Sequence, residues 1–427
     1  MYSRTTIALI VGIALLSWGP GAAAALTETP AGQLRVTLDR LLSEHAFLTV
    51  QAMHAGVTDD DLFAAAAEAL EANTAALEEA IAGIYGEAAG RGFGDLWRAH
   101  IGYVVDYTRA HRADDEAAKK RAQEGLQAFQ EDFTAFLSGA NPELSEEGLR
   151  SLLEDHLGQL EQVAHLHGGD YGAAYESARH AHQHMFALGD GLSAAIATQL
   201  PETFTGRSFA FGPAMDLRLT LDQLLGEHAF LAAEVMRMAE ADSDAETAAA
   251  EALAANGESI RAALEDIYGA EAASGFAEVW EQHNGHYVDY VRATQGGDDA
   301  ATARARTGLE DFSDEVADFF VAAADLPDGD AVRGGLRAHT DHLIEQVDAY
   351  ASGDYATAFA IAREAYQHMG GISDVLATGI ANQFPERFLP DTAVGSAGDV
   401  PLGGWFGWCL LVAAGSAAAT MSARRRR

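Results

Sequence analysis

The sequence predicts an all-α protein in which one helical bundle occurs twice in tandem, with about six helices in each copy. First, residues 217–231 repeat residues 34–48 at most positions, and the matches continue at an offset of 183 or 184 as far as Phe204 and Phe388. Second, apolar residues recur at intervals of three and four, which is the spacing of one helix face. Third, no convincing alternation of apolar and polar residues marks a strand. A repeat of this length predicts two equivalent structural units.

Turn and capping residues divide the first copy into its helices. Thr58-Asp59-Asp60 and Gly86 after Tyr85 interrupt the apolar pattern, and Ser145 is a candidate residue for capping a helix N-terminus. The second copy repeats this plan, with Gly269 after Tyr268. The predicted helices of the first copy are residues 31–55, 59–84, 91–111, 114–138, 145–167 and 171–199.

The whole chain divides into seven segments. The two copies are each large enough for a core of their own, and the linker between them is short, so we expect the bundles to pack against each other. The predicted segments are a signal peptide (1–25), the first bundle (26–204), a linker (205–213), the second bundle (214–388), a sorting-like motif with its spacer (389–401), a transmembrane segment (402–421) and a basic cytoplasmic tail (422–427).

The two ends of the chain predict export and anchoring. Arg4, an apolar run over residues 7–18 and a small-residue stretch ending at Ala25 have the layout of a signal peptide. Residues 402–421 carry no charge and are followed by Arg424–Arg427, which is typical of a membrane span with a positive cytoplasmic end. The only cysteine, Cys409, lies in that span, so no disulfide framework exists.

A short motif stands before the predicted span. Leu389, Pro390 and Thr392 match the Leu-Pro-x-Thr-Gly pattern, and Ala393 stands where the pattern has glycine. The order of motif, apolar segment and basic tail resembles the cell-wall sorting signal of bacterial surface proteins. That resemblance implies sortase cleavage after Thr392 and attachment to the wall. Without cleavage, residues 402–421 remain as a membrane helix, and both cases predict the extracellular face of the cell envelope.

The charge balance excludes one class of partner. The chain has 64 acidic and 27 basic residues, a net charge of −37, and five of the arginines lie in the two end segments. So acidic a surface repels nucleic acid. No phosphate-binding glycine loop, no serine nucleophile with a positioned base and no paired cysteine site is present, so catalysis has no specific support.

Histidines are the candidate functional residues. Four of them recur in both copies, each pair on a different predicted helix and on its apolar stripe, so four imidazoles should point into each core. An unpaired polar group in a core costs about 1–3 kcal/mol, and neutral imidazole is a ligand for Zn, Cu, Fe and Ni. The predicted metal ligands are His45, His100, His156 and His184, with their equivalents His228, His283, His339 and His368. Glu44 and Glu227 precede the first pair and are possible further ligands or orienting groups.

One inward histidine on each helix resembles the haemerythrin and ferritin-like bundles, which implies iron held by histidines and carboxylates. A mononuclear site for Cu, Fe or Zn and, less favoured, haem between two histidines are alternatives. Trp97, Tyr107 and Met185, with their equivalents, are candidate lining residues. The sequence therefore predicts an exported protein that binds a metal in each copy. The alternatives are a structural or adhesion module whose histidines only complete the core, and a metal-dependent oxidase.

Overall fold

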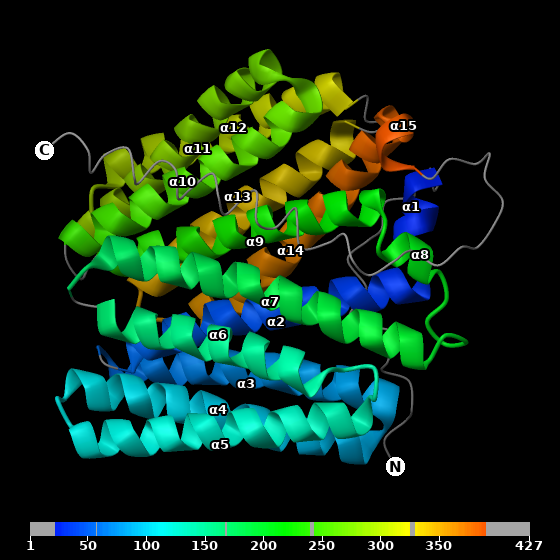
Figure 1. Ribbon diagram of the computed structural model, residues 1–427. Helices are drawn as coiled ribbons and strands as arrows, with labels where there is room; N and C mark the ends of the chain where they lie inside the picture. Colours follow the sequence, from blue (N-terminus) through cyan, green and yellow to red (C-terminus); the bar gives the residue numbers. More distant parts are fainter. Residues whose placement is uncertain (1–21, 57, 167–168, 240–242, 325–328, 390–427) are drawn as a thin grey trace, which may run out of the picture. The chain divides into compact units, whose positions relative to one another are not determined.

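The protein is described here by a computed structural model, which covers residues 22–56, 58–166, 169–239, 243–324 and 329–389. Those residues are helical apart from short connections, so the all-α prediction is confirmed for them (Figure 1). No helix in these ranges has the length and apolar character needed to cross a membrane. The predicted membrane span, the sorting-like motif after Leu389 and the signal peptide up to residue 21 lie outside the described residues.

The first copy consists of six long helices, which match the six predicted ones to within four residues at each end. They are α2 (Pro30–Ala55), α3 (Asp60–Tyr85), α4 (Glu87–Arg112), α5 (Glu116–Ala140), α6 (Glu146–Leu166) and α7 (Tyr171–Gln199). Ser145 caps the start of α6, as its sequence context predicts, and Asp59 caps the start of α3 in the same way. The left-handed φ of 91° at Gly86, which favours glycine, lets α4 begin directly after α3.

The second copy repeats this order. Its helices are α9 (Pro213–Met238), α10 (Ser243–Tyr268), α11 (Ala270–Gly296), α12 (Asp299–Ala324), α13 (Gly329–Ala351) and α14 (Tyr355–Gln383). Three short helices join or flank the copies, namely α1 (Ala22–Thr27), α8 (Arg207–Ala210) and α15 (Pro385–Phe388). The predicted linker therefore contains α8, whose Ala210 carbonyl accepts a hydrogen bond from Arg35 of α2 at 2.8 Å.

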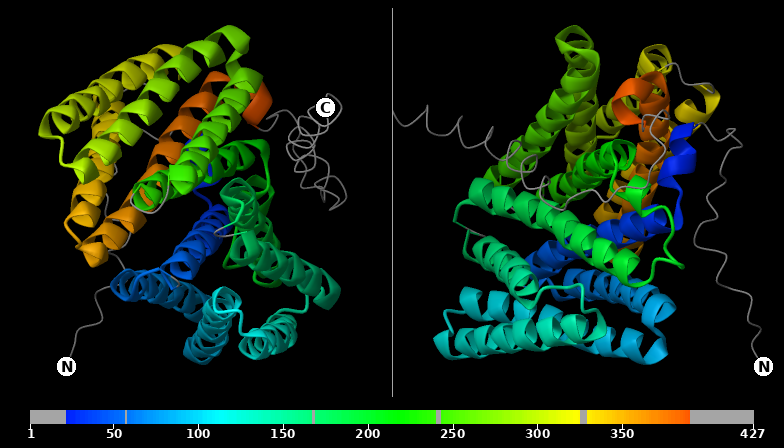
Figure 2. Two further views of the ribbon diagram at one scale, coloured as in Figure 1. Left: turned by 90° about the vertical axis from the view of Figure 1, so that its left-hand side faces the viewer. Right: turned by 45° about the vertical axis from the view of Figure 1, so that its right-hand side comes forward.

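Each copy is a closed ring of helices. Consecutive helices pack side by side, and the last helix of each copy returns to pack on its first, α7 on α2 and α14 on α9. The alternate helices α2, α4 and α6 also contact one another across the ring, as do α9, α11 and α13. This arrangement brings one face of three helices to the centre of each bundle (Figures 1 and 2).

The two copies pack against each other through equivalent surfaces. α3 contacts α14 and α10 contacts α7, which is the same pairing exchanged between the copies, and α2 contacts α9. Equivalent residues meet in three places: the rings of Phe47 and Phe230 lie 4.9 Å apart, Gln51 donates to Glu234, and His182 lies 3.2 Å from the Tyr366 hydroxyl. Contacts between equivalent positions mark a twofold-like axis. Residues 22–389 accordingly form one compact unit.

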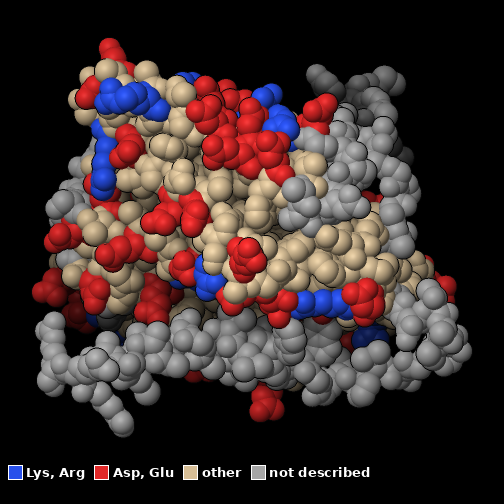
Figure 3. Space-filling model, turned by 90° about the horizontal axis from the view of Figure 1, so that it is seen from above, with Lys and Arg blue, Asp and Glu red and all other residues tan. Residues whose placement is uncertain are grey.

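The surface is acidic. Red carboxylate groups outnumber blue basic groups on the face of the molecule in Figure 3, in agreement with the net charge of −37.

Candidate metal centres

Three histidines of each copy meet at the centre of the bundle. We call His45 (α2), His100 (α4) and His156 (α6) the first triad, and the equivalent set on α9, α11 and α13, namely His228, His283 and His339, the second triad. Each histidine continues an apolar stripe at helical spacing, and the three helices of a triad are those that contact across the ring. All six side chains are at most 3% exposed.

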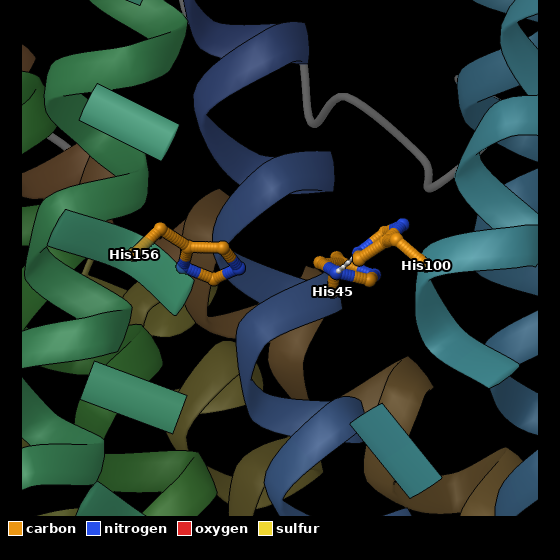
Figure 4. A group of neighbouring side chains, drawn as sticks. All are labelled: His45, His100 and His156. Carbon is orange, nitrogen blue, oxygen red and sulfur yellow. Dashed lines mark hydrogen bonds between the residues drawn. The ribbon is translucent and has the colours of Figure 1, made fainter. Parts of the chain in front are cut away.

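The triad imidazoles are close enough to share one ion. Each residue offers a ligand nitrogen, and the three nitrogens of a triad lie within 4.8 Å of one another. In the first triad, the Nε2 atoms of His45 and His100 are 3.2 Å apart, and the His156 ring points toward this pair (Figure 4). In the second triad, the three ring centroids form a triangle with sides of 5.6 Å.

These spacings fit a metal ion. Metal–imidazole bonds of about 2.0–2.1 Å in tetrahedral geometry place two ligand nitrogens about 3.3 Å apart. The distance of 3.2 Å between the Nε2 atoms of His45 and His100 is already close to this value. His156 and the members of the second triad need only small side-chain movements to reach it.

Most of the triad nitrogens have no protein partner. In the second triad, neither ring nitrogen of any of the three histidines has a hydrogen bond in the described structure, and in the first the same holds for both nitrogens of His156. His45 Nε2 has, besides His100, only a long contact of 3.4 Å to the Thr49 hydroxyl. Buried polar atoms without a partner are rare in folded proteins and each requires an explanation.

All six imidazoles are neutral near pH 7. Burial lowers the pKa of His100 and His156 to about 3 and that of His228 to about 4, because the apolar core disfavours the charged ring. Burial also lowers the pKa of His45, His283 and His339 well below the usual value, with a smaller contribution from the neighbouring triad rings. Neutral imidazole is the form that binds a metal, so no proton has to leave before an ion enters.

Aromatic rings surround each triad. Trp97 lies 4.6 Å from both His45 and His100, and Phe129 of α5 stacks on His100 at 4.5 Å. In the second copy, Phe312 stacks on His283 at 3.9 Å. These rings exclude water and fix the orientation of the imidazoles. Sequence reasoning missed the two phenylalanines, although their recurrence at an offset of 183 was a usable signal.

The structure does not bring His184 and His368 into the triads. Both are half-buried, and each Nε2 donates to a backbone carbonyl at 2.8 Å, that of Leu152 for His184 and that of Gly335 for His368. The His184 ring lies parallel to that of His156 with a centroid separation of 6.4 Å. These two histidines therefore have protein partners and lie outside the triads.

On each of these two helices, the methionine that follows the histidine faces the core instead. Met185 on α7 is fully buried and Met369 on α14 is 2% exposed. Adjacent helix residues point about 100° apart, so a helix that directs its methionine inward turns the preceding histidine toward the bundle surface. Of the four recurring histidines, three in each copy thus point into the bundle, and on the fourth helix the adjacent methionine points inward instead.

Glu44 and Glu227 lie outside the triads as well, although both are buried. Glu44 accepts hydrogen bonds from Asn73 at 2.7 Å and from Arg363 of the other copy at 3.0 Å. Glu227 does the same with Asn256 and with Arg179, the residue equivalent to Arg363. Both carboxylates join the copies together.

The triads are thus defined by their own geometry: three neutral, buried, largely unpartnered imidazoles from alternate helices, enclosed by aromatic rings. Such an arrangement can coordinate a transition metal. It offers no imidazolium as an acid for proton transfer at neutral pH, because burial keeps the six rings unprotonated. Compared with protein-family models, with curated proteins and with solved structures, the chain finds no match.

Proposed function

We propose that each copy binds one transition-metal ion through its triad, His45, His100 and His156 in the first and His228, His283 and His339 in the second. The observation that carries this proposal is that three imidazoles offer ligand nitrogens within 4.8 Å of one another in each core, while most of the triad nitrogens have no protein partner in the described structure. An ion replaces the missing partners of several nitrogens at once. Without an ion, each unpaired group opposes folding by about 1–3 kcal/mol.

The surroundings favour an ion over haem. A porphyrin requires a flat slot between two opposed imidazoles, whereas the first-triad rings pack directly against Trp97 and Phe129. The same packing favours binding over oxidase chemistry, because a substrate needs access to the metal. The metal would serve storage, transfer or structural stabilisation.

The test is metal analysis of protein purified without an affinity metal, followed by titration with Cu, Fe and Zn. We expect about two equivalents of one metal per chain and a higher melting temperature of the loaded protein. The variant His45→Ala/His228→Ala should lose both the metal and the stabilisation.

The matched control is His184→Ala/His368→Ala, which removes the same number of imidazoles outside the triads. It should keep both equivalents. A folded protein that takes up none of these metals, or a control that loses them as the first variant does, would contradict the proposal.

We also propose that the protein is exported and attached to the cell envelope, through a sortase acting after Thr392 or through the apolar segment 402–421. The support is the sequence pattern of the two ends. Cell fractionation with antibody against the helical body tests this proposal. Recovery in the soluble interior of the cell would contradict it.

A further inference from the structure

The second triad borders a cavity at the centre of its bundle. The cavity measures about 30 Å³ and is lined by residues from all six helices of the copy, with His339 contributing from the triad and Met369 from α14. Trp280, which packs against His228, also borders it. The other lining side chains are apolar. A volume of this size holds a water molecule or a small ion, but an apolar lining does not retain water.

Met369 therefore borders the same cavity as His339 of the triad. Its thioether is the only soft ligand among the lining residues, and the methionine recurs at the equivalent, fully buried position Met185 in the first copy. Leucine or isoleucine occupies neighbouring lining positions, so apolar filling alone does not require sulfur here. Soft sulfur ligands such as a thioether suit monovalent copper, and also zinc, better than the harder transition-metal ions.

The charge around the triad points the same way. The cost of burying an ion grows with the square of its charge, so a divalent ion is about four times as expensive as a monovalent one in the same core. No carboxylate belongs to the described groups of possible ligands at the triads. The nearest acidic candidate in sequence, Glu227, is held by Arg179 at 2.9 Å and by Asn256 at 2.8 Å. A divalent ion would lack a counter-charge from the protein.

We propose that the second copy holds monovalent copper, bound by the imidazoles of His228, His283 and His339 and by the Met369 thioether. This inference rests on the proposed function, because it names the ion and the fourth ligand of the same site. A neutral set of three nitrogens and one sulfur in a dry core matches the ligand preference and the single charge of Cu(I).

The first test compares Cu(I) with Zn(II). Full-length metal-free protein is titrated anaerobically with each ion against a chromophoric chelator. We expect Cu(I) to bind at least about 1,000-fold more tightly than Zn(II), because the thioether is a soft ligand and because the uncompensated charge in the core is only half as large for the monovalent ion. Equal affinity would overturn this inference while leaving the proposed function standing. If neither ion binds and iron does not either, the proposed function fails, and this inference fails with it.

The second test identifies the sulfur ligand. X-ray absorption of the Cu(I)-loaded protein should show sulfur beside nitrogen around copper, and Met369→Leu, which preserves the side-chain volume, should reduce that signal and weaken Cu(I) binding about tenfold. The control is Met236→Leu on α9, a methionine buried to the same 2% that does not line the cavity. An unchanged sulfur signal in Met369→Leu would overturn the assignment of this ligand, whether or not copper still binds to the imidazoles.

Discussion

Buried polar side chains occupy two regions of this protein, and the regions differ in how those side chains are paired. Between the copies, Glu44 accepts hydrogen bonds from Asn73 and Arg363, and Glu227 accepts them from Asn256 and Arg179. In the bundle centres, the triad nitrogens have few protein partners or none. Between the copies, these buried carboxylates are therefore paired with other protein side chains. This difference supports the proposal that the triads bind a metal ion.

One residue at the interface tests this contrast. Asp39 is fully buried, and its oxygens have no hydrogen-bond donor in the described structure. Burial, with the neighbouring charge of Asp190, raises its pKa well above the usual value, which favours the protonated carboxyl group. A protonated Asp39 can donate to Asp190, and a proton thus supplies the missing partner. The triad imidazoles have no such solution, because a proton would place a charge in the core.

The largest predicted effect is acid destabilisation of the metal-free protein. The six triad imidazoles stay neutral when folded, whereas in the unfolded chain they bind protons below about pH 6.5. The unfolded state then binds more protons, so stability is full above pH 6.5 and falls as the pH drops toward 4. Between pH 7 and 5.5 each imidazole contributes a loss of about 1.3 kcal/mol, or about 8 kcal/mol for six.

Buried carboxyl groups work in the opposite direction. The pKa of Asp39 and Asp222 is raised by burial and that of Asp216 is raised to about 6, so the folded state binds these protons first and gains stability on acidification. We expect a net loss on the order of 5 kcal/mol, measured by urea denaturation of metal-free protein at both pH values. Equal stability at pH 7 and 5.5 would mean that the imidazoles are not buried as neutral rings.

The next effect concerns the ion pairs between the copies. Arg363→Met leaves the Glu44 carboxylate buried with only Asn73 as partner, and we expect a loss of about 3 kcal/mol in the free energy of unfolding. The double variant Glu44→Met/Arg363→Met should recover most of this loss, since it removes both charges. The control Arg337→Met breaks an exposed pair with Asp314 and should change stability by less than about 1 kcal/mol. A loss in the control as large as in Arg363→Met would remove the distinction between buried and exposed pairs.

In the second triad, we expect one substitution to increase the stability of the metal-free protein by a smaller amount. His339→Leu removes two unpaired nitrogens, and the adjoining cavity of about 30 Å³ gives the new side chain room to adjust. The metal-free protein should therefore become more stable by about 1–2 kcal/mol, while the stabilisation by metal at this site disappears. Thermal denaturation with and without metal measures both quantities. Destabilisation of the metal-free protein by this variant would show that His339 already has a good partner.

The sequence was sufficient for the helices and for the inward direction of three histidines in each copy. Stripes such as Leu38, Leu41, His45 and Leu48 place an imidazole on the apolar face, and His45 is indeed fully buried. Spacing along a helix does not say which helices meet across a ring, nor at what height. The convergence of α2, α4 and α6 therefore required the structure.

The fourth helix shows the limit of such reasoning. Ala181, His184 and Leu188 fit an apolar stripe, but so do Ala181, Met185 and Leu188, because steps of three and four are both helical. Only the packing of the helix in the bundle distinguishes these two stripes, and the packing places Met185 in the core. Glu44 was uncertain for a related reason, since the arginine that binds it belongs to the other copy. Three side chains recur together in both copies, namely Glu44/Glu227, Asn73/Asn256 and Arg179/Arg363. Their joint recurrence was a sequence signal that the arginine of each copy binds the glutamate of the other.

The smallest predicted effect addresses Thr49, the hydrogen-bond contact of His45 outside its triad in the described structure. Thr49 lies 3.4 Å from the His45 Nε2 atom, and its equivalent in the second copy is Ala232, which has no hydroxyl group. A contact of this length contributes little, so Thr49→Val should change the free energy of unfolding by less than about 0.5 kcal/mol and metal affinity by no more than about twofold. Chemical denaturation and metal titration measure the two quantities. A loss of about 1.5 kcal/mol or more would mean that His45 has a protein partner after all, and the first triad would then resemble the paired side chains between the copies.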